Sequence, residues 1–173
     1  MMKNKYAWFS AIVAAIIFVD QLTKFVVVRR FRLHESIRII PGFFDLTYVR
    51  NPGAAFGFLA GAPGMWRSIF FITVSIVALA VILFLVRQAH DRLSLIAFAL
   101  IGGGAVGNLV DRVRFGEVVD FIDWYYRTYH WPTFNIADSA ISLGVGLMAI
   151  DMLFSKKQLT AEDSEELQKP HRE

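Results

Sequence analysis

The sequence predicts an all-α polytopic membrane protein with four transmembrane helices and a small extracytoplasmic β-sheet in its first long loop. The chain of 173 residues is 55% hydrophobic and only 19% charged, which is too apolar for a soluble domain of this size. Four apolar segments reach the ~20 residues that a helix needs to cross a ~30 Å hydrocarbon core. Short runs rich in Ile, Phe, Val and Tyr in the first long loop predict the sheet.

The four predicted spans and the loops between them form a single membrane-embedded domain over residues 1–154. The spans cover residues 8–28, 67–87, 93–113 and 134–154. The first resembles a secretory signal peptide because Lys3 and Lys5 precede its apolar run. No small-x-small cleavage site follows, so we expect it to be retained. Residues 155–173 are polar and charged and are predicted to form a frayed or disordered cytoplasmic tail.

The two long loops carry different patterns. The first loop contains two strand-like runs, residues 37–40 and 44–50, with a Pro-Gly turn between them. The second loop, residues 114–133, is rich in Trp and Tyr, which gather at bilayer interfaces because an apolar ring and a polar tip are both satisfied there. We therefore expect a small sheet from the first loop and an interfacial aromatic belt from the second.

The loop charges give conflicting indications of the orientation in the membrane. An even number of spans puts both termini on one side. The short basic connection at residues 87–92 favours cytoplasmic termini, while the arginines of the first loop favour the opposite. Because the positive-inside rule applies best to short connections, we expect both termini in the cytoplasm and both long loops outside it.

Residue types that are absent or scattered exclude several classes of chemistry. The chain has no cysteine, so disulfides, thiolate nucleophiles and cysteine-ligated metals are ruled out. Its basic residues form no nucleic-acid motif. The histidines, which show no metal-ligand spacing, are His34, His90, His130 and His171. We expect no metal, no cofactor and no nucleic-acid partner.

Polar residues lie near one end of three of the predicted spans. The clusters are Asp20, Gln21 and Lys24 in the first span, Asn108, Asp111 and Arg112 in the third, and Asn135, Asp138 and Ser139 in the fourth. The third span also contains Gly103 and Gly107, whose spacing lets a second helix approach closely. The first and third helices run in the same direction and the fourth runs back. All three clusters are therefore expected at the same face of the membrane.

Asp138 is the leading candidate for chemistry, because an ionisable side chain inside a span costs roughly 2.5–3.5 kcal/mol to insert. We predict that it pairs with a second carboxylate. Two close carboxylates cannot both ionise easily, so they share one proton and can activate a water. Asp120 lies just upstream and is our expected partner, although spacing alone allows Asp111 or Asp123 equally.

Structural roles compete with functional ones at several of these positions. Asp20 and Lys24 are spaced i, i+4 and can form an ion pair that serves only the fold. Asp111 beside Arg112 can equally anchor a helix end at the interface. Two other functions also stay open, a small proton-coupled transporter and a non-enzymatic scaffold. Against the transporter, the polar residues gather at one face and the sequence shows no internal repeat.

Five short motifs together resemble the lipoprotein signal peptidase family, the bacterial signal peptidase II. They are DQLTK at 20–24, NPGAAF at 51–56, GGAVGNLVDR at 103–112, VVDFI at 118–122 and FNIADS at 134–139. Five such motifs in the same order among four spans make a specific match over roughly residues 8–154. The resemblance implies an aspartyl endopeptidase of the bacterial inner membrane. It would remove signal peptides from diacylglyceryl-modified prolipoproteins by cutting before the lipidated cysteine.

The resemblance also implies residue roles and partners. It places the catalytic pair on Asp120 and Asp138, at the periplasmic face. The other motif residues, which would shape the site and hold the substrate, are Asp20, Lys24, Asn51, Gly53, Asn108, Asp111, Arg112, Asn135 and Ala137. Membrane lipids and family-type peptide inhibitors such as globomycin are further expected partners. The first loop is predicted to close over the site as a lid, with Gly53 and Gly57 allowing the movement.

Overall fold

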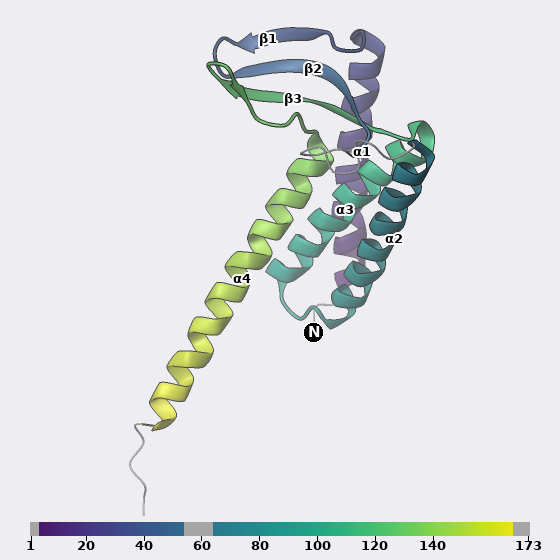
Figure 1. Cartoon of the computed structure of the whole chain (residues 1–173). Helices are drawn as coiled ribbons and strands as arrows, with labels where there is room; N and C mark the ends of the chain where they lie inside the picture. The colour runs from purple at the N-terminus through teal and green to yellow at the C-terminus, as the bar shows by residue number, and fades with distance from the viewer. Residues whose placement is uncertain (1–3, 54–63, 168–173) are drawn as a thin grey trace, which may run out of the picture.

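The computed structural model describes residues 4–53 and 64–167, with side chains of the last helix described as far as residue 153. Within these residues, four helices are long and apolar enough to cross a membrane. They are α1 (Lys5–Arg30), α2 (Gly64–Gln88), α3 (Arg92–Phe115) and α4 (Ile136–Leu167). Figure 1 shows them running alternately in opposite directions, with the sheet at one end of the bundle. The prediction of four membrane-spanning helices is confirmed.

The boundaries of α3 follow from its capping residues. Asp91 precedes the helix, and its carboxylate accepts a hydrogen bond from Ser94 N at 2.7 Å, which satisfies a free N–H of the first turn. Gly116 follows the helix at φ 74°, a left-handed conformation that glycine adopts without steric strain. It donates its N–H to Arg112 O at 2.9 Å. The helix therefore ends immediately after its polar cluster, next to the sheet.

α3 is the centre of the bundle. In its membrane-spanning window 56% of the residues are buried, against 11–17% in the other three helices. Its glycines allow the close helix approach that was predicted. A Cβ on Gly103 would lie 2.9 Å from Ile16 of α1, and one on Gly107 would lie 3.2 Å from Ala137 of α4. The outward faces of α1, α2 and α4 carry exposed apolar side chains, as contact with lipid requires.

α4 is longer than the predicted fourth span. Its membrane-spanning part covers Ile136–Leu153, and the helix continues to Leu167. Part of the segment that we expected to be a frayed tail is therefore helical. In Figure 1 the last part of α4 leads away from the sheet and extends beyond the end of the bundle where α1 begins.

The sheet has four antiparallel strands in the order β1-β2-β3-β4. β1 (Ser36–Ile40) and β2 (Phe44–Asn51) lie between α1 and α2, where the two strand-like runs predicted them. β3 (Val118–Tyr126) and β4 (Tyr129–His130) lie between α3 and α4, in the segment that we expected to be only an aromatic belt. The sheet is thus built from both connections and not from the first alone. β3 pairs with β2 over most of its length, a long-range contact that local patterns do not reveal.

Apolar packing and backbone hydrogen bonds set the position of β3. Val27 of α1 packs with buried side chains of β2 and β3 and attaches the sheet to the bundle. Phe134, just before α4, pairs with β3: its N–H donates to Ile122 O at 3.1 Å and its carbonyl accepts from Ile122 N at 2.8 Å. β3 consequently passes beside the N-terminus of α4, and this brings residue 120 close to residues 135–138.

Candidate active site

Buried polar side chains from α1, α3, the start of α4 and the sheet gather where the bundle meets the sheet. Apart from Thr47, the buried polar and charged residues among those described are Asp20, Lys24, Asn108, Asp111, Asp120 and Asn135. Asp138 is half-buried among them. Within the described residues, every buried side-chain nitrogen and oxygen has a hydrogen-bond partner. The polar clusters that the sequence placed at one face of the membrane do converge.

The first turn of α4 fixes Asp138. Asn135 precedes the helix, and its Oδ1 accepts the N–H of Asp138 at 2.9 Å. In return, Asp138 Oδ2 accepts the backbone N–H of Asn135 at 3.2 Å, which makes a reciprocal capping box. The neighbouring N–H of Ala137 donates to Asp20 Oδ1 of α1 at 2.9 Å. Asp138 is therefore held by the end of its own helix, where the helix dipole also favours a carboxylate.

Asp120 lies on β3, and both of its carboxylate oxygens accept hydrogen bonds from amide side chains. Oδ1 accepts from Asn135 Nδ2 at 2.7 Å, and Oδ2 accepts from Asn51 Nδ2 at 2.8 Å. Asn51 is fixed in turn because its Oδ1 accepts the N–H of Gly53 at 2.8 Å. Asn135 thus contacts both candidate carboxylates, Asp120 through its side chain and Asp138 through its backbone.

Asn108 of α3 is the second amide between these groups. Its Nδ2 donates to Asp138 Oδ1 at 2.7 Å, and its Oδ1 accepts from Asn135 Nδ2 at 3.1 Å. Lys24 sets the orientation of this amide, because its Nζ donates to the same Oδ1 at 3.0 Å. With a cation on the oxygen, the N–H group of Asn108 is directed to Asp138. A residue of α1 thereby determines which group of α3 faces the carboxylate.

Lys24 also joins the two remaining carboxylates of the region. Its Nζ lies 2.9 Å from Asp20 Oδ2 and 2.9 Å from Asp111 Oδ2, and all three side chains are almost fully buried. Asp111 Oδ2 accepts the Val119 N–H of β3 at 3.1 Å as well. The i, i+4 ion pair of α1 is therefore part of a larger network that reaches α3, α4 and β3. These contacts are compatible with both roles that the sequence left open, a structural ion pair and a site element.

Burial and the charge of Asp138 raise the pKa of Asp120 to about 7. Hydrogen bonds from Asn51 and Asn135 and the charge of Lys24 act in the opposite direction without compensating. Near neutral pH this carboxyl group therefore exchanges a proton readily, as a general acid or base must. In the part of the chain that the structure describes, no basic side chain forms an ion pair with Asp120 or Asp138.

The other two carboxylates that spacing allowed as partners of Asp138 are engaged elsewhere. Asp111 bonds to Lys24, as described above. Asp123 bonds to the ring of His130, with its Oδ2 2.9 Å from Nδ1. Of the three candidates, Asp120 is the one whose carboxylate shares a hydrogen-bonding residue with Asp138.

Arg112 and Gly53, which were predicted to shape the site, both border it. Arg112 donates to Asn108 O at 3.4 Å, and its guanidinium lies 5.2 Å from the centroid of the Phe71 ring of α2. Gly53 has φ +93°, and a Cβ there would collide with the same Phe71 ring. Gly57, the second glycine of the predicted lid, lies outside the described residues, as does the end of the NPGAAF motif.

Two contributors were not assigned a role from the sequence. Gln21 was noted only as a member of the first polar cluster. Its Nε2 donates to Asp20 Oδ2, to Asp111 Oδ1 and to Gly107 O, each at 3.1 Å. Phe71 lies on α2, a span without a polar cluster, and an apolar residue in an apolar helix gives no signal of its contact with the site.

Four helices long and apolar enough to cross a membrane define the class as a multi-pass membrane protein. At one end of the bundle, two carboxylates accept hydrogen bonds from the same asparagine and form a paired-carboxylate site. Among the described residues, no group of three or more His, Asp or Glu side chains is placed to hold a metal ion.

Comparison with known proteins identifies the family. The family model described as signal peptidase (SPase) II matches residues 12–154. The chain is 50% identical over 159 residues to the lipoprotein signal peptidase of Syntrophus aciditrophicus (strain SB). This alignment covers 91% of this chain and 99% of the relative. It is 48% identical over 159 residues to the lipoprotein signal peptidase of Geobacter metallireducens, with 91% and 97% covered. This chain therefore belongs to the signal peptidase II family of proteases, and the resemblance carried by the five motifs is confirmed.

Solved structures share the fold. A bacterial membrane enzyme determined by the in meso method at 2.3 Å resolution superposes with a TM-score of 0.79 at 32% identity, covering 96% of this chain and 94% of that one. A second structure of a bacterial membrane enzyme, determined by the same method at 1.9 Å, gives a TM-score of 0.74 at 34% identity, with 85% and 93% covered. The bundle with its sheet is thus the fold of solved membrane enzymes that have related sequences.

Proposed function

We propose that this chain is an aspartic-type endopeptidase that removes the signal peptide from diacylglyceryl-modified prolipoproteins, cutting just before the lipidated cysteine. Relatives named lipoprotein signal peptidase, 48–50% identical over 91% of the chain, support this reaction and substrate class. The paired carboxylates support the aspartic mechanism. A proton-coupled transporter is not favoured, because the buried ionisable residues of the described spans lie at one end of the bundle.

The observation that carries the mechanism is the position of Asn135 between two carboxyl groups. It donates to Asp120 Oδ1 at 2.7 Å and to Asp138 Oδ2 at 3.2 Å. Two carboxylates bridged by one residue and partly removed from water cannot both carry a charge without a large energetic penalty, so the pair retains one proton near neutral pH. The pKa of Asp120, raised to about 7 by burial and by Asp138, has the same origin. The proton belongs to the pair, and neither residue is assigned as the permanent acid.

In the proposed hydrolysis, the pair carries one proton before and after each step. The ionised carboxylate takes a proton from water as the water oxygen attacks the scissile carbonyl carbon, and the protonated carboxyl group donates its proton to the carbonyl oxygen. The resulting gem-diol returns one hydroxyl proton to the pair as the C–N bond breaks. The amino group of the cysteine leaves with the proton that came from water. Asp120 and Asp138 then hold one proton between them, as they did at the start.

The surrounding residues hold this pair through hydrogen bonds and form no ion pair with it among the described residues. The amides of Asn51, Asn108 and Asn135 donate to the carboxylates, so the pair stays in place in either protonation state. The site-shaping residues behind them are Asp20, Lys24, Asp111 and Ala137, which connect α1 to α3 and to the first turn of α4. We assign Arg112 and Gly53, at the border of the site, to contacts with the substrate backbone.

We further propose that the site faces the periplasm at the outer surface of the bacterial inner membrane, with both termini in the cytoplasm. Figure 1 shows the sheet at one end of the bundle, while α1 begins and α4 continues at the other end. A lipid-bearing substrate stays in the bilayer, so a site at the end of the bundle meets it at the interface. Membrane lipids and family-type peptide inhibitors such as globomycin are expected to approach by the same route.

The test is cleavage of a diacylglyceryl-modified prolipoprotein by the purified protein, with a chelator present throughout. The unaltered protein is expected to cut before the lipidated cysteine. Asp120→Asn and Asp138→Asn are expected to insert and fold normally and to leave the substrate intact. Asp123→Asn is the matched control, because Asp123 lies on the same strand but bonds to His130. This control should cut at the rate of the unaltered protein.

Two outcomes would contradict the proposal in different ways. Efficient cleavage by Asp120→Asn would mean that the pairing with Asp138 is wrong. Failure of the unaltered protein to cut, in an assay where a relative of the same family is active, would refute the function itself.

A further inference from the structure

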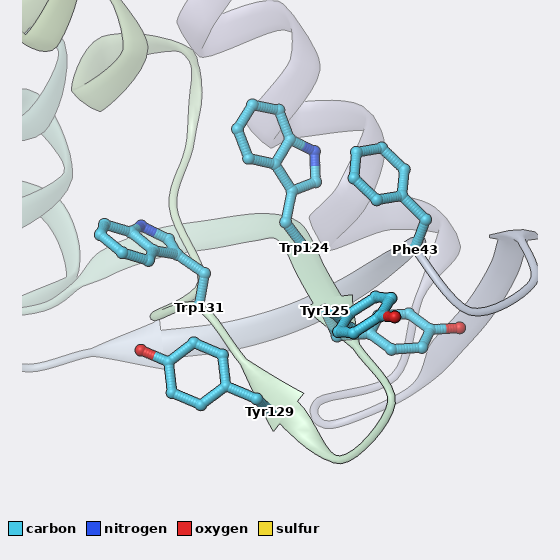
Figure 2. A pocket seen from close by; sticks show the side chains of 6 residues that line it. Phe43, Trp124, Tyr125, Tyr129 and Trp131 are labelled. Atoms are coloured by element: carbon cyan, nitrogen blue, oxygen red, sulfur yellow. The ribbon is translucent and has the colours of Figure 1, made fainter.

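A pocket of about 290 Å³ with an entirely aromatic lining lies at the outer end of the sheet. It is lined by Phe43, Trp124, Tyr125, Tyr126, Tyr129 and Trp131. Figure 2 shows Trp124 and Phe43 extending side by side, and their rings stack with centroids 6.2 Å apart. All but Tyr125 are about half exposed or more, from 48% for Trp124 to 68% for Tyr126. Open apolar surface of this kind is typical of a binding site.

The pocket continues a face of the sheet that begins at the candidate active site. Successive strand residues point to opposite faces, so Asp120, Ile122 and Trp124 share one face of β3. Their cross-strand neighbours on β2 are apolar beyond the carboxylate: Leu46 pairs with Ile122, and Phe44 pairs with Trp124. An apolar surface therefore leads outward along the sheet from Asp120.

Near the bundle, the opposite face of β3 carries Val119 and Phe121, which are buried with Val27, but toward the outer end this face is polar. Asp45 of β2 lies there, paired with Asp123 of β3 on one side and with Arg38 of β1 on the other. Tyr125 is on this face too: its hydroxyl donates to Asp45 Oδ1 at 3.1 Å, and its ring stacks on His130. The outer part of the sheet is thus amphipathic, with one face suited to an apolar ligand and Asp45 and Asp123 on the other. The candidate catalytic carboxylate belongs to the apolar face.

Trp124 links the pocket to the site. Its ring packs edge-on against Phe134, with 5.0 Å between the centroids. Phe134 immediately precedes Asn135, the residue that contacts both carboxylates. Trp124 lies four residue steps along the extended strand from Asp120, which is about 13 Å. An acyl chain of a membrane lipid spans about half of the ~30 Å hydrocarbon core, or about 15 Å. A chain that starts at the site therefore reaches the pocket.

From this continuity we infer that the apolar face and the aromatic pocket bind an acyl chain of the substrate's diacylglyceryl group. The inference rests on the proposed function, in which the scissile bond adjoins the cysteine that carries this group. The lipid then begins next to the carboxylates, and the sheet offers it an apolar surface leading away from them. Flat aromatic rings give a methylene chain extensive dispersion contacts, and Trp and Tyr keep their polar tips at the interface.

The experiment measures quenching of Trp124 fluorescence by a nitroxide on an acyl chain of a diacylglyceryl lipopeptide substrate. Trp8, Trp66 and Trp131 are changed to Phe so that Trp124 is the only tryptophan, and Asp138→Asn keeps the lipopeptide uncleaved in nanodiscs. We expect the lipopeptide to quench severalfold more than a nitroxide-labelled phospholipid at the same mole fraction. Equal quenching by the two probes would mean that bulk lipid covers the pocket and would overturn the inference. Absence of quenching by either probe would also overturn it.

A second single-tryptophan protein, which keeps Trp66 and has Phe at the other three positions, is the matched control. Trp66 is 65% exposed on α2 and does not line the pocket. The two probes should therefore quench it equally at equal mole fraction. If Trp66 prefers the lipopeptide as strongly as Trp124 does, the substrate collects around the whole bundle, and the assignment to the pocket is wrong.

The kinetics of Trp124→Ala give an independent readout. Removing the ring should raise KM for a substrate with two long acyl chains by about tenfold, as expected for losing roughly 50 Å² of apolar contact. Its kcat should change little, and a substrate with short acyl chains should show no comparable rise in KM. A fall in kcat with unchanged KM would indicate damage to the carboxylates through Phe134 and would count against the pocket.

Failure of the inference and failure of the proposed function can be told apart. Cleavage of the lipopeptide is measured separately on the protein with its native residues. If that protein cuts the lipopeptide but Trp124 is not quenched, the function stands and the acyl pocket is refuted. If Trp124 is quenched but nothing is cut, the acyl pocket stands and the peptidase proposal is refuted.

Discussion

The candidate site contains two pairs of aspartates that are held in different ways. Asp20 and Asp111 both lie 2.9 Å from the buried ammonium group of Lys24. Asp120 and Asp138 accept hydrogen bonds from neutral asparagine side chains and backbone groups. Breaking a buried ion pair is strongly destabilising, because it leaves an uncompensated charge. A carboxylate held by amides can gain or lose a proton without losing its position. The first pair therefore suits structure and the second suits chemistry.

The largest expected effect is a difference in cleavage rate between substitutions in the two pairs. Asp138→Asn removes proton transfer at nearly constant shape, so the cleavage rate should fall at least ~10³-fold, within the range that acid–base residues contribute. Asp111→Asn should leave measurable cleavage in the protein that folds. Initial rates on a diacylglyceryl lipopeptide measure this, after size-exclusion chromatography has isolated folded protein. If folded Asp111→Asn is as inactive as Asp138→Asn, the division into a structural and a chemical pair is wrong.

Stability should rank the pairs in the opposite order. Lys24→Met leaves Asp20 and Asp111 buried without their cation and should lower the free energy of unfolding by about 3–5 kcal/mol. Adding Asp20→Asn and Asp111→Asn removes the unpaired charges and should recover part of this loss. Thermal unfolding in detergent measures both variants. Asp138→Asn is the comparison: it breaks no ion pair but replaces one of two hydrogen-bond acceptors by a donor, so it should cost only about 1 kcal/mol. A Lys24→Met protein of undiminished stability would show that the ammonium group does not hold the first pair.

The pH dependence of cleavage tests the second pair. Burial and the charge of Asp138 raise the pKa of Asp120 to about 7, above the ~3.9 of an unfolded chain. Because hydrolysis needs one proton on the pair, kcat/KM should fall as the pH rises through about 7. Cleavage that instead rises to a plateau above this pH would indicate a single ionised base and no shared proton.

The raised pKa of Asp120 also predicts how the stability of the protein changes with pH, and proton linkage fixes the sign of that change. Between about pH 4 and pH 7 the folded protein binds the Asp120 proton more tightly than the unfolded chain does, so stability should fall as the pH rises through this window. Above about pH 7 this contribution should change no further. In Asp120→Asn this contribution should be absent and the decline smaller, and thermal unfolding across this pH range compares the two proteins.

The spans and the convergence of the polar clusters were predictable because both depend on local patterns, the length of an apolar run and the position of polar residues along it. The partner of Asp138 was not, since spacing alone allowed Asp111 and Asp123 as well as Asp120. The motif resemblance favoured Asp120. In the structure its position depends on β3 pairing with β2, which brings together Asn51 and Asp120, 69 residues apart. Pairing between strands so far apart in the chain produces no local sequence pattern, and β3 was not predicted for that reason.

The direction of the hydrogen bonds in the site could also not be predicted from the sequence. Asn108 was predicted as a site residue, but its orientation depends on Lys24, which donates to its oxygen from another helix. Similarly, Asn135 and Asp138 have the spacing of a capping box, yet only the structure shows that the same asparagine reaches Asp120. Residue types and spacing select the members of the site, and tertiary packing decides which donor meets which acceptor.

The smallest expected effect compares two hydrogen bonds that both join α3 to α4. At the sheet end, Asn108 Nδ2 donates to Asp138 Oδ1 at 2.7 Å; toward the other end, Ser94 Oγ donates to Asp151 Oδ2 at 3.0 Å. Ser94→Ala should lower stability by about 1 kcal/mol, as for a partly exposed hydrogen bond, and should leave the cleavage rate unchanged. Asn108→Ala should lower both, because Lys24 also loses an acceptor. If Ser94→Ala slows cleavage as much as Asn108→Ala does, the contact between the helices matters, and not the amide that faces the carboxylate.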